Sequence, residues 1–82
     1  MEITVVGVGL PEGRRLFENV ETGLMKAGVY AELNKGSLSD LPPGDRGRKL
    51  PLLYIDGKLI CEGLILSVKE VQELLAGSNP IV

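Results

Sequence analysis

Apolar and polar residues alternate with different periods along the chain, and these periods predict a strand, a helix and a second strand. Residues 2–6 (EITVV) are rich in β-branched side chains, which favours a strand. From residue 12 to residue 27, apolar residues recur at helical spacing with charges between them, and Gly28 follows as a C-cap. Residues 29–33 (VYAEL) alternate again, so we expect a second strand parallel to the first, joined by a right-handed βαβ connection. The apolar positions of the helix are Leu16, Phe17, Val20 and Leu24.

The second half of the chain has the pattern of a hairpin followed by a helix. Residues 52–55 and 58–62 are apolar alternating runs separated by Asp56-Gly57, a pair that strongly favours a two-residue hairpin turn. A further helix begins after Ser67 and ends at Gly77. It is marked by a capping-box glutamate and an apolar stripe: Glu70, Val68, Val71, Leu74 and Leu75.

A polar segment separates the two halves. Residues 34–49 are crowded with Gly, Ser, Asp and Pro, and at most one short helix, near 37–41, can form before the prolines at 42–43 stop it. The order of elements is therefore βαβ, a short helix, and ββα. We expect one α/β domain over residues 1–77, with a four-stranded mixed sheet flanked by helices on its faces, and a flexible tail at 78–82.

Composition and charge narrow the possible functions. The 82 residues carry a net charge of −2 with a pI near 5.0, which gives no reason to expect nucleic-acid binding. No apolar run approaches the roughly 20 residues of a membrane helix and no secretory signal is visible, so we expect a cytoplasmic protein without membrane contact. Histidine is absent and Cys61 is the only cysteine. An intramolecular disulfide, a zinc site and a Ser-His-Asp triad are therefore excluded within this chain, and we expect neither a metal nor a cofactor.

A glycine-rich bend lies between the first strand and the first helix. Gly7, Gly9 and Gly13 follow a strand and open a helix, as in dinucleotide-binding proteins, and Glu32 lies about twenty residues on, where a ribose-binding acid is expected. However, the spacing is one residue longer than the usual fingerprint, and Pro11 removes an amide donor. The hairpin also leaves no room for further parallel strands. Nucleotide binding is therefore the less favoured hypothesis for this bend.

The order of elements and the amino-acid sequence of the hairpin resemble those of the small thioredoxin-like (glutaredoxin-sized) redox proteins, over nearly all of residues 3–76. The most specific match is the segment PLLYIDGK, with EG at the end of the hairpin. In that family a proline ahead of the hairpin forms a cis peptide bond beside the active-site bend and shapes substrate binding. The resemblance therefore implies a thioredoxin-like fold and a cis bond between Leu50 and Pro51.

The chain departs from this family at the redox cysteines. The two cysteines of the family's bend align with Leu10 and Gly13, and the sequence LPEG contains no thiol, so this bend cannot form a reversible disulfide. We therefore expect a redox-inactive, non-catalytic binding or accessory module that keeps the groove between the bend and the proline. The residues expected in this groove are Gly9, Leu10, Pro11, Glu12, Gly13, Arg14, Leu50 and Pro51.

The apolar tip of the bend has two interpretations. If Leu10 and Pro11 are exposed, they form an apolar spot beside the proline groove that suits an extended peptide. If Leu10 folds inward, it fills the space that the cysteines left.

Basic residues follow the bend in two segments, at the start of the first helix and just ahead of Pro51. Arg14 and Arg15 are in the first turn of the helix, where positive charge opposes the helix dipole. In a thioredoxin-like fold residues 46–49 come close to them, which gives an anion-attracting patch in an acidic protein. The alternative is that these side chains only flank a solvated loop. The partner is accordingly expected to be a protein or peptide, or a small anionic ligand. The patch comprises Arg14, Arg15, Arg46, Arg48 and Lys49.

Cys61 is the remaining candidate for chemistry. A thiol within a strand is most often a small buried apolar residue, and the charges beside it, Lys58 and Glu62, have opposite signs. The alternative is a single-cysteine, oxidoreductase-like protein that forms mixed disulfides through Cys61.

The aromatic residues and the sheet edges give the last expectations. Tyr30 and Tyr54 are expected to pack as strand aromatics. Short exposed edge strands are compatible with either a monomer or a weak homodimer.

Overall fold

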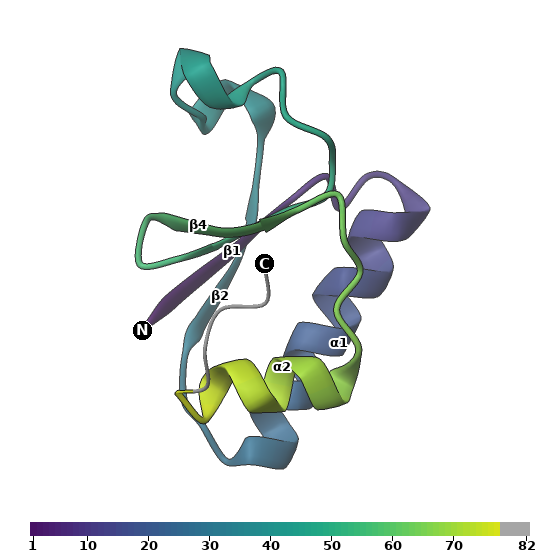
Figure 1. Cartoon of the computed structure of the whole chain (residues 1–82), viewed down its shortest axis with the longest axis vertical. Helices are drawn as coiled ribbons and strands as arrows, with labels where there is room; N and C mark the ends of the chain where they lie inside the picture. The colour runs from purple at the N-terminus through teal and green to yellow at the C-terminus, as the bar shows by residue number, and fades with distance from the viewer. Residues whose placement is uncertain (78–82) are drawn as a thin grey trace.

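The computed structural model describes residues 1–77 and has an α/β fold (Figure 1). In this range the strands are β1 (Glu2–Val6), β2 (Glu32–Gly36), β3 (Leu52–Ile55) and β4 (Lys58–Glu62), and the helices are α1 (Pro11–Ala27) and α2 (Val68–Leu75). Two single-turn 3-10 helices, Leu38–Asp40 and Pro43–Asp45, lie between β2 and β3. None of these helices is long and apolar enough to cross a membrane. The tail at 78–82, for which we expected flexibility, lies outside the described residues.

The strands form one mixed sheet in the order β2-β1-β3-β4. β1 and β2 are parallel and joined through α1, whereas β3 is antiparallel to both β1 and β4. The hairpin turns at Asp56 and Gly57, whose φ angles of 50° and 79° are the geometry that an Asp-Gly pair favours. The prediction of a four-stranded mixed sheet is confirmed.

Both α-helices pack on the same face of the sheet. The apolar stripes of α1 and α2 meet side chains from three strands in one core. The Asn19 side-chain amide donates to the carbonyl of Leu66 (2.9 Å), which ties α1 to the segment before α2. The buried members of this core are Ile3, Val5, Leu16, Val20, Leu24, Leu53, Cys61, Leu66 and Val71.

The opposite face is covered by the segment between β2 and β3. There Leu41 packs with three buried sheet residues, Val6, Leu52 and Tyr54. The expectation of one short helix near 37–41 agrees with the 3-10 helix Leu38–Asp40, but a second single-turn 3-10 helix, Pro43–Asp45, follows it. The expectation of helices over both faces holds only in this limited form, because both α-helices of residues 1–77 lie on the other face. The prolines at 42–43 explain the difference, since proline lacks an amide donor and the residue before it avoids helical backbone.

β2 begins later than the pattern of residues 29–33 predicts. Gly28 is left-handed (φ 67°) and the amide of Val29 donates to the carbonyl of Leu24 (3.1 Å), so the closing turn of α1 uses the start of the predicted strand. Val29 packs against the core while Tyr30 is 100% exposed, so a capping turn produces the same alternation as a strand. The expectation that Tyr30 packs is therefore wrong.

Candidate functional site

A tight turn joins β1 to α1 and sets the position of Leu10. Gly7 has a φ of 101°, a value that favours glycine, and its carbonyl accepts the amide hydrogen of Leu10 (3.0 Å). The carbonyl of Leu10 in turn accepts from the amide of Arg14 (3.0 Å), so the helix begins immediately after this leucine. The Leu10 side chain is 45% exposed, which agrees with the exposed rather than the inward interpretation.

Gly13 lies where α1 passes closest to the bend. A Cβ at this position would collide with the carbonyl oxygen of Gly7, so no side chain fits without a shift of the backbone. A Cβ on Gly9, by contrast, would meet no atom within 4 Å. Gly7 and Gly13 therefore shape the bend itself, and the position aligned with the family's second cysteine has no room for a thiol.

The structure gives little support to nucleotide binding at this bend. The bend follows Val6 at the carboxyl end of β1, whereas Glu32 pairs with Glu2 at the opposite end of the parallel strands. Glu32 is therefore separated, along the strand direction, from the bend where a pyrophosphate would bind. The amide of Leu10 is also unavailable to a phosphate, because it already donates to the carbonyl of Gly7.

The Leu50–Pro51 segment lies directly against the bend. The peptide bond between these residues is cis, as the resemblance implies. A Cβ on Gly7 would lie 3.3 Å from Leu50 Cβ and 3.5 Å from Pro51 Cα, so the two segments are in contact. Pro51 itself is buried, and its carbonyl accepts the amide hydrogen of Gly63 (2.8 Å). The side of this segment that remains accessible is Leu50.

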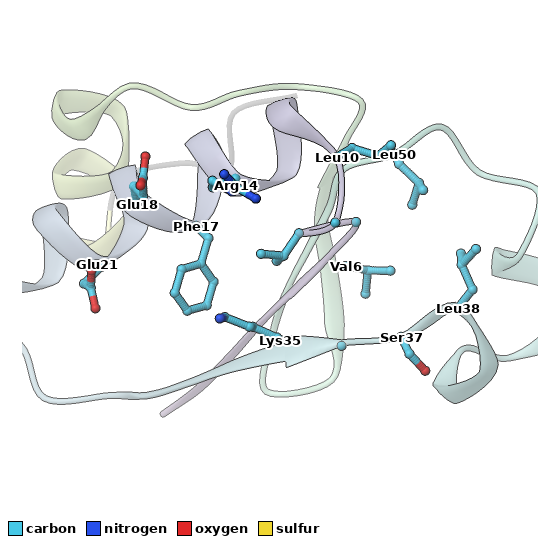
Figure 2. Close-up of a pocket in the computed structure, with 14 residues that line it drawn as sticks. Val6, Leu10, Arg14, Phe17, Glu18, Glu21, Lys35, Ser37, Leu38 and Leu50 are labelled. Carbon is cyan, nitrogen blue, oxygen red and sulfur yellow. The ribbon is translucent and has the colours of Figure 1, made fainter.

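An open groove of about 960 Å³ extends from the bend along α1 to the carboxyl end of β2. Figure 2 shows Leu10 beside Leu50 at one end, with Leu38 pointing toward them, and Phe17 facing Lys35 further along. The Lys35 ammonium lies 5.3 Å from the centre of the Phe17 ring, a cation–π contact. The apolar lining comprises Val6, Val8, Leu10, Phe17, Leu38 and Leu50.

The groove also carries balanced charge. Arg14 and Lys35 provide two cations, and Glu18 and Glu21 on α1 provide two carboxylates. The groove is therefore mainly an apolar surface with polar borders rather than a strongly charged anion site.

The predicted groove residues divide into two groups. Gly9, Leu10, Arg14 and Leu50 line the groove. The other four do not: Pro11 and Glu12 are exposed outside it, and Gly13 and Pro51 are buried behind it.

The groove residues that β2 and the segment after it contribute are not predicted by the sequence pattern. The predicted second strand, 29–33, ends before Lys35, so Lys35 falls in the polar middle segment of the prediction although it lies in β2. Leu38 falls in the same predicted segment and begins the first 3-10 helix. On α1, the helical spacing from Arg14 through Phe17 and Glu18 to Glu21 contained the signal for one groove-facing stripe.

The basic residues of the predicted patch are held in two separate places. Arg14 and Arg15 lie at the mouth of α1, where they border a shallow hollow of about 260 Å³. Arg48 forms ion pairs with Asp45 (2.8 Å) and Glu62 (2.9 Å), and Arg46 donates to the carbonyl of Leu41 (3.2 Å). The Lys49 backbone amide donates to Glu62 (3.1 Å). The segment 46–49 therefore uses its polar groups to fasten the loop to β4, and Arg46, Arg48 and Lys49 do not line the groove.

Asp45 is the centre of this fastening network. The Tyr54 hydroxyl donates to Asp45 Oδ2 (3.0 Å), and Arg48 Nε donates to Asp45 Oδ1 (2.8 Å). Arg48, followed by Tyr54, holds the pKa of Asp45 below its ordinary value, while burial and the nearby Asp45 raise the pKa of Tyr54. Tyr54 therefore packs as expected and also anchors the loop.

Cys61 lies in the core on the helix face of the sheet. It is 6% exposed and packs with Leu53 and Val71. Burial, together with the charge of Glu70, raises the pKa of the thiol, so the reactive thiolate is suppressed at neutral pH. Within residues 1–77, no three His, Cys, Asp or Glu side chains are grouped to hold a metal ion.

Comparisons with known proteins do not assign the chain to a family. No family model matches it, and no curated protein is similar to it in sequence. The function of the groove therefore rests on the chemistry of its own residues.

Proposed function

We propose that this chain is a thioredoxin-like binding module without redox chemistry, and that the groove at the N-terminal end of α1 binds a protein or peptide partner. The observation that carries the proposal is an exposed apolar contact surface at the N-terminal end of α1. Leu10 is exposed beside Leu50 at an open groove, in the position where the resemblance implies the first redox cysteine. Exposed apolar side chains that border a groove favour an extended chain segment as the ligand.

The element order and the bend support the thioredoxin-like assignment. A βαβ unit is followed by a ββα unit around one mixed sheet, and the bend after β1 is in contact with Leu50–Pro51 at the mouth of α1. These are the features that the resemblance implies for a substrate-docking groove.

A small anionic ligand is less well supported than a peptide. Arg14 and Lys35 line the groove, but Glu18 and Glu21 line it as well, so the side chains supply no net positive charge. A single-cysteine activity is opposed by the burial of Cys61.

Insulin reduction in the presence of dithiothreitol tests the absence of redox chemistry. We expect the wild-type protein to accelerate the reaction no more than the Cys61→Ala variant does. Acceleration by the wild-type protein that is lost in Cys61→Ala would support the single-cysteine alternative instead.

Selection of displayed random dodecapeptides on the immobilised protein tests the groove. We expect selected peptides to bind the wild-type protein and the Met25→Asp variant alike, and to bind Leu10→Asp at least about tenfold more weakly. Met25 is a suitable control because it is 77% exposed near the far end of the same helix. Peptides that bind the wild-type protein and Leu10→Asp equally well would place the binding surface elsewhere.

A further inference from the structure

β2 is an edge strand whose outer side has backbone groups available for pairing. It pairs with β1 on one side, and no described strand lies on the other. The amide of Glu32 donates to the carbonyl of Met1 (2.9 Å), so Glu32 points toward β1. Because backbone groups alternate in direction along a strand, the amides and carbonyls of Leu33 and Lys35 point outward.

The surface is hollowed on both faces of the sheet beside this edge. On the helix face lies the groove of about 960 Å³, and on the opposite face lies a second hollow of about 360 Å³ under the 3-10 turns. The two hollows share Val6, at the carboxyl end of β1, and Lys35, Gly36 and Ser37, at the carboxyl end of β2.

We propose that the free edge of β2 captures an extended peptide as a fifth strand, whose side chains enter the two hollows alternately. This inference rests on the proposed function and names its partner. An extended chain sends successive side chains to opposite faces, so it can fill two hollows on opposite sides of the strand it joins. Main-chain hydrogen bonds to Leu33 and Lys35 hold the peptide, and the hollows select its side chains.

The chemistry of the hollows differs and specifies the peptide. The groove on the helix face is lined by Leu10, Phe17 and Leu50, which favours aliphatic side chains. The opposite hollow contains three carboxylates, Glu2, Asp40 and Asp45. Lys35 also borders it, but the Lys35 ammonium lies over the Phe17 ring on the helix face. Of these carboxylates only Asp45 forms an ion pair within residues 1–77. The hollow therefore favours a basic side chain, and the peptide alternates apolar and basic residues.

A second copy of this chain fits the edge less well than a peptide does. The Leu33 side chain of β2 already packs against its own core, and Gly36 has no side chain to offer. A paired β2 from another copy therefore offers no free aliphatic side chain to the groove. A free peptide has all of its side chains available.

Amide exchange of the labelled protein with a synthetic heptapeptide tests the pairing directly. The probe is an acetylated and amidated peptide of alternating valine and lysine. With saturating peptide we expect exchange of the Leu33 and Lys35 amides to slow at least about tenfold, because both become hydrogen-bonded to the added strand. A matched peptide with glutamate in place of lysine is expected to bind at least about tenfold more weakly.

Backbone methylation distinguishes strand pairing from side-chain contact alone. Two further peptides carry N-methyl groups either on all valines or on all lysines. Only one set of amides faces β2 in an added strand, so we expect one methylated peptide to lose binding and the other to retain it. The set that loses binding identifies whether the peptide runs parallel or antiparallel to β2.

Three outcomes would overturn the inference. Binding that shifts the Leu10 and Leu50 resonances without protecting Leu33 and Lys35 would refute strand addition and leave the proposed groove function standing. No binding of the valine–lysine peptide would refute the peptide chemistry, while the Leu10→Asp comparison still tests the groove. Protection of Leu33 and Lys35 in a dimer without peptide would assign the edge to a second copy.

Discussion

Gly7 and Gly13 show how single residues decide what the bend between β1 and α1 can do. Gly7 provides the left-handed turn (φ 101°), and Gly13 allows the helix to pass against the Gly7 carbonyl. Leu10 then lies exposed at the helix mouth, while the thiol of Cys61 is buried in the core. These two glycines, which in the sequence resemble part of a phosphate-binding loop, therefore allow the helix to pack closely against the bend. The groove beside them is mainly apolar.

Replacement of Gly13 tests this close approach. In Gly13→Ala the added Cβ must displace the Gly7 carbonyl, so we expect the free energy of unfolding to fall by about 1–3 kcal/mol, despite the higher helix propensity of alanine. Urea denaturation measures the change. Gly9→Ala is the matched control, because its Cβ meets no atom within 4 Å, and it should change stability by no more than about 0.5 kcal/mol. Equal effects at the two positions would contradict the proposed role of Gly13.

The lowered pKa of Asp45 predicts a pH dependence of stability. A carboxyl whose pKa is lower in the folded state stabilises the fold above its unfolded pKa, near 4, and loses this contribution as the pH falls through the folded pKa. We therefore expect Asp45→Asn to melt at a lower temperature than the wild-type protein at pH 7, with the difference shrinking progressively below about pH 4. Melting curves between pH 2 and pH 7 measure it. A difference that is independent of pH would show that the ion pair with Arg48 does not contribute.

At the scale of elements, local signals predicted most of the fold. The bounds of β1, the β3–β4 hairpin and the capping box of α2 follow from residues that act within a few positions of one another. The predicted start of β2 is too early because Val29 and Ala31 pack against the core on either side of the exposed Tyr30. This alternation comes from the turn that caps α1, and local periodicity cannot distinguish it from a strand. The placement of both α-helices on one face depends on tertiary packing and was not predicted.

The contact between α1 and α2 depends on a small residue. A Cβ on Gly23 would lie 2.5 Å from Val71 Cγ1, so we expect Gly23→Ala to reduce the free energy of unfolding by about 1–3 kcal/mol. The double variant Gly23→Ala/Val71→Ala should be less destabilised than the sum of the two single variants, by about 1 kcal/mol, because the second change makes room for the first. Urea denaturation of the four proteins measures this coupling. Strict additivity would show that the helices do not approach one another at Gly23.

At the scale of the whole molecule, the groove is made by segments that are distant in sequence. The bend after β1, one stripe of α1, the end of β2 and Leu50 meet only in the folded chain. The resemblance to thioredoxin-like proteins predicts that the bend lies beside Leu50–Pro51. It does not predict that Phe17, Lys35 and Leu38 line the same groove. The basic residues at 46–49 were expected near the bend, yet Arg48 is paired with Asp45 and Glu62 instead. Sequence proximity of charges does not specify which carboxylates the fold brings within reach.

Methyl NMR of the leucine-labelled protein, titrated with a dodecapeptide selected for binding to the immobilised protein, tests most directly whether the groove is the binding surface. We expect the methyl resonances of Leu10 and Leu50 to shift together along one saturation curve, while those of Leu59, on the far edge strand β4, remain unchanged. Shifts at Leu59 without shifts at Leu10 and Leu50, or no shifts at any of the three, would contradict the assignment of function to this groove.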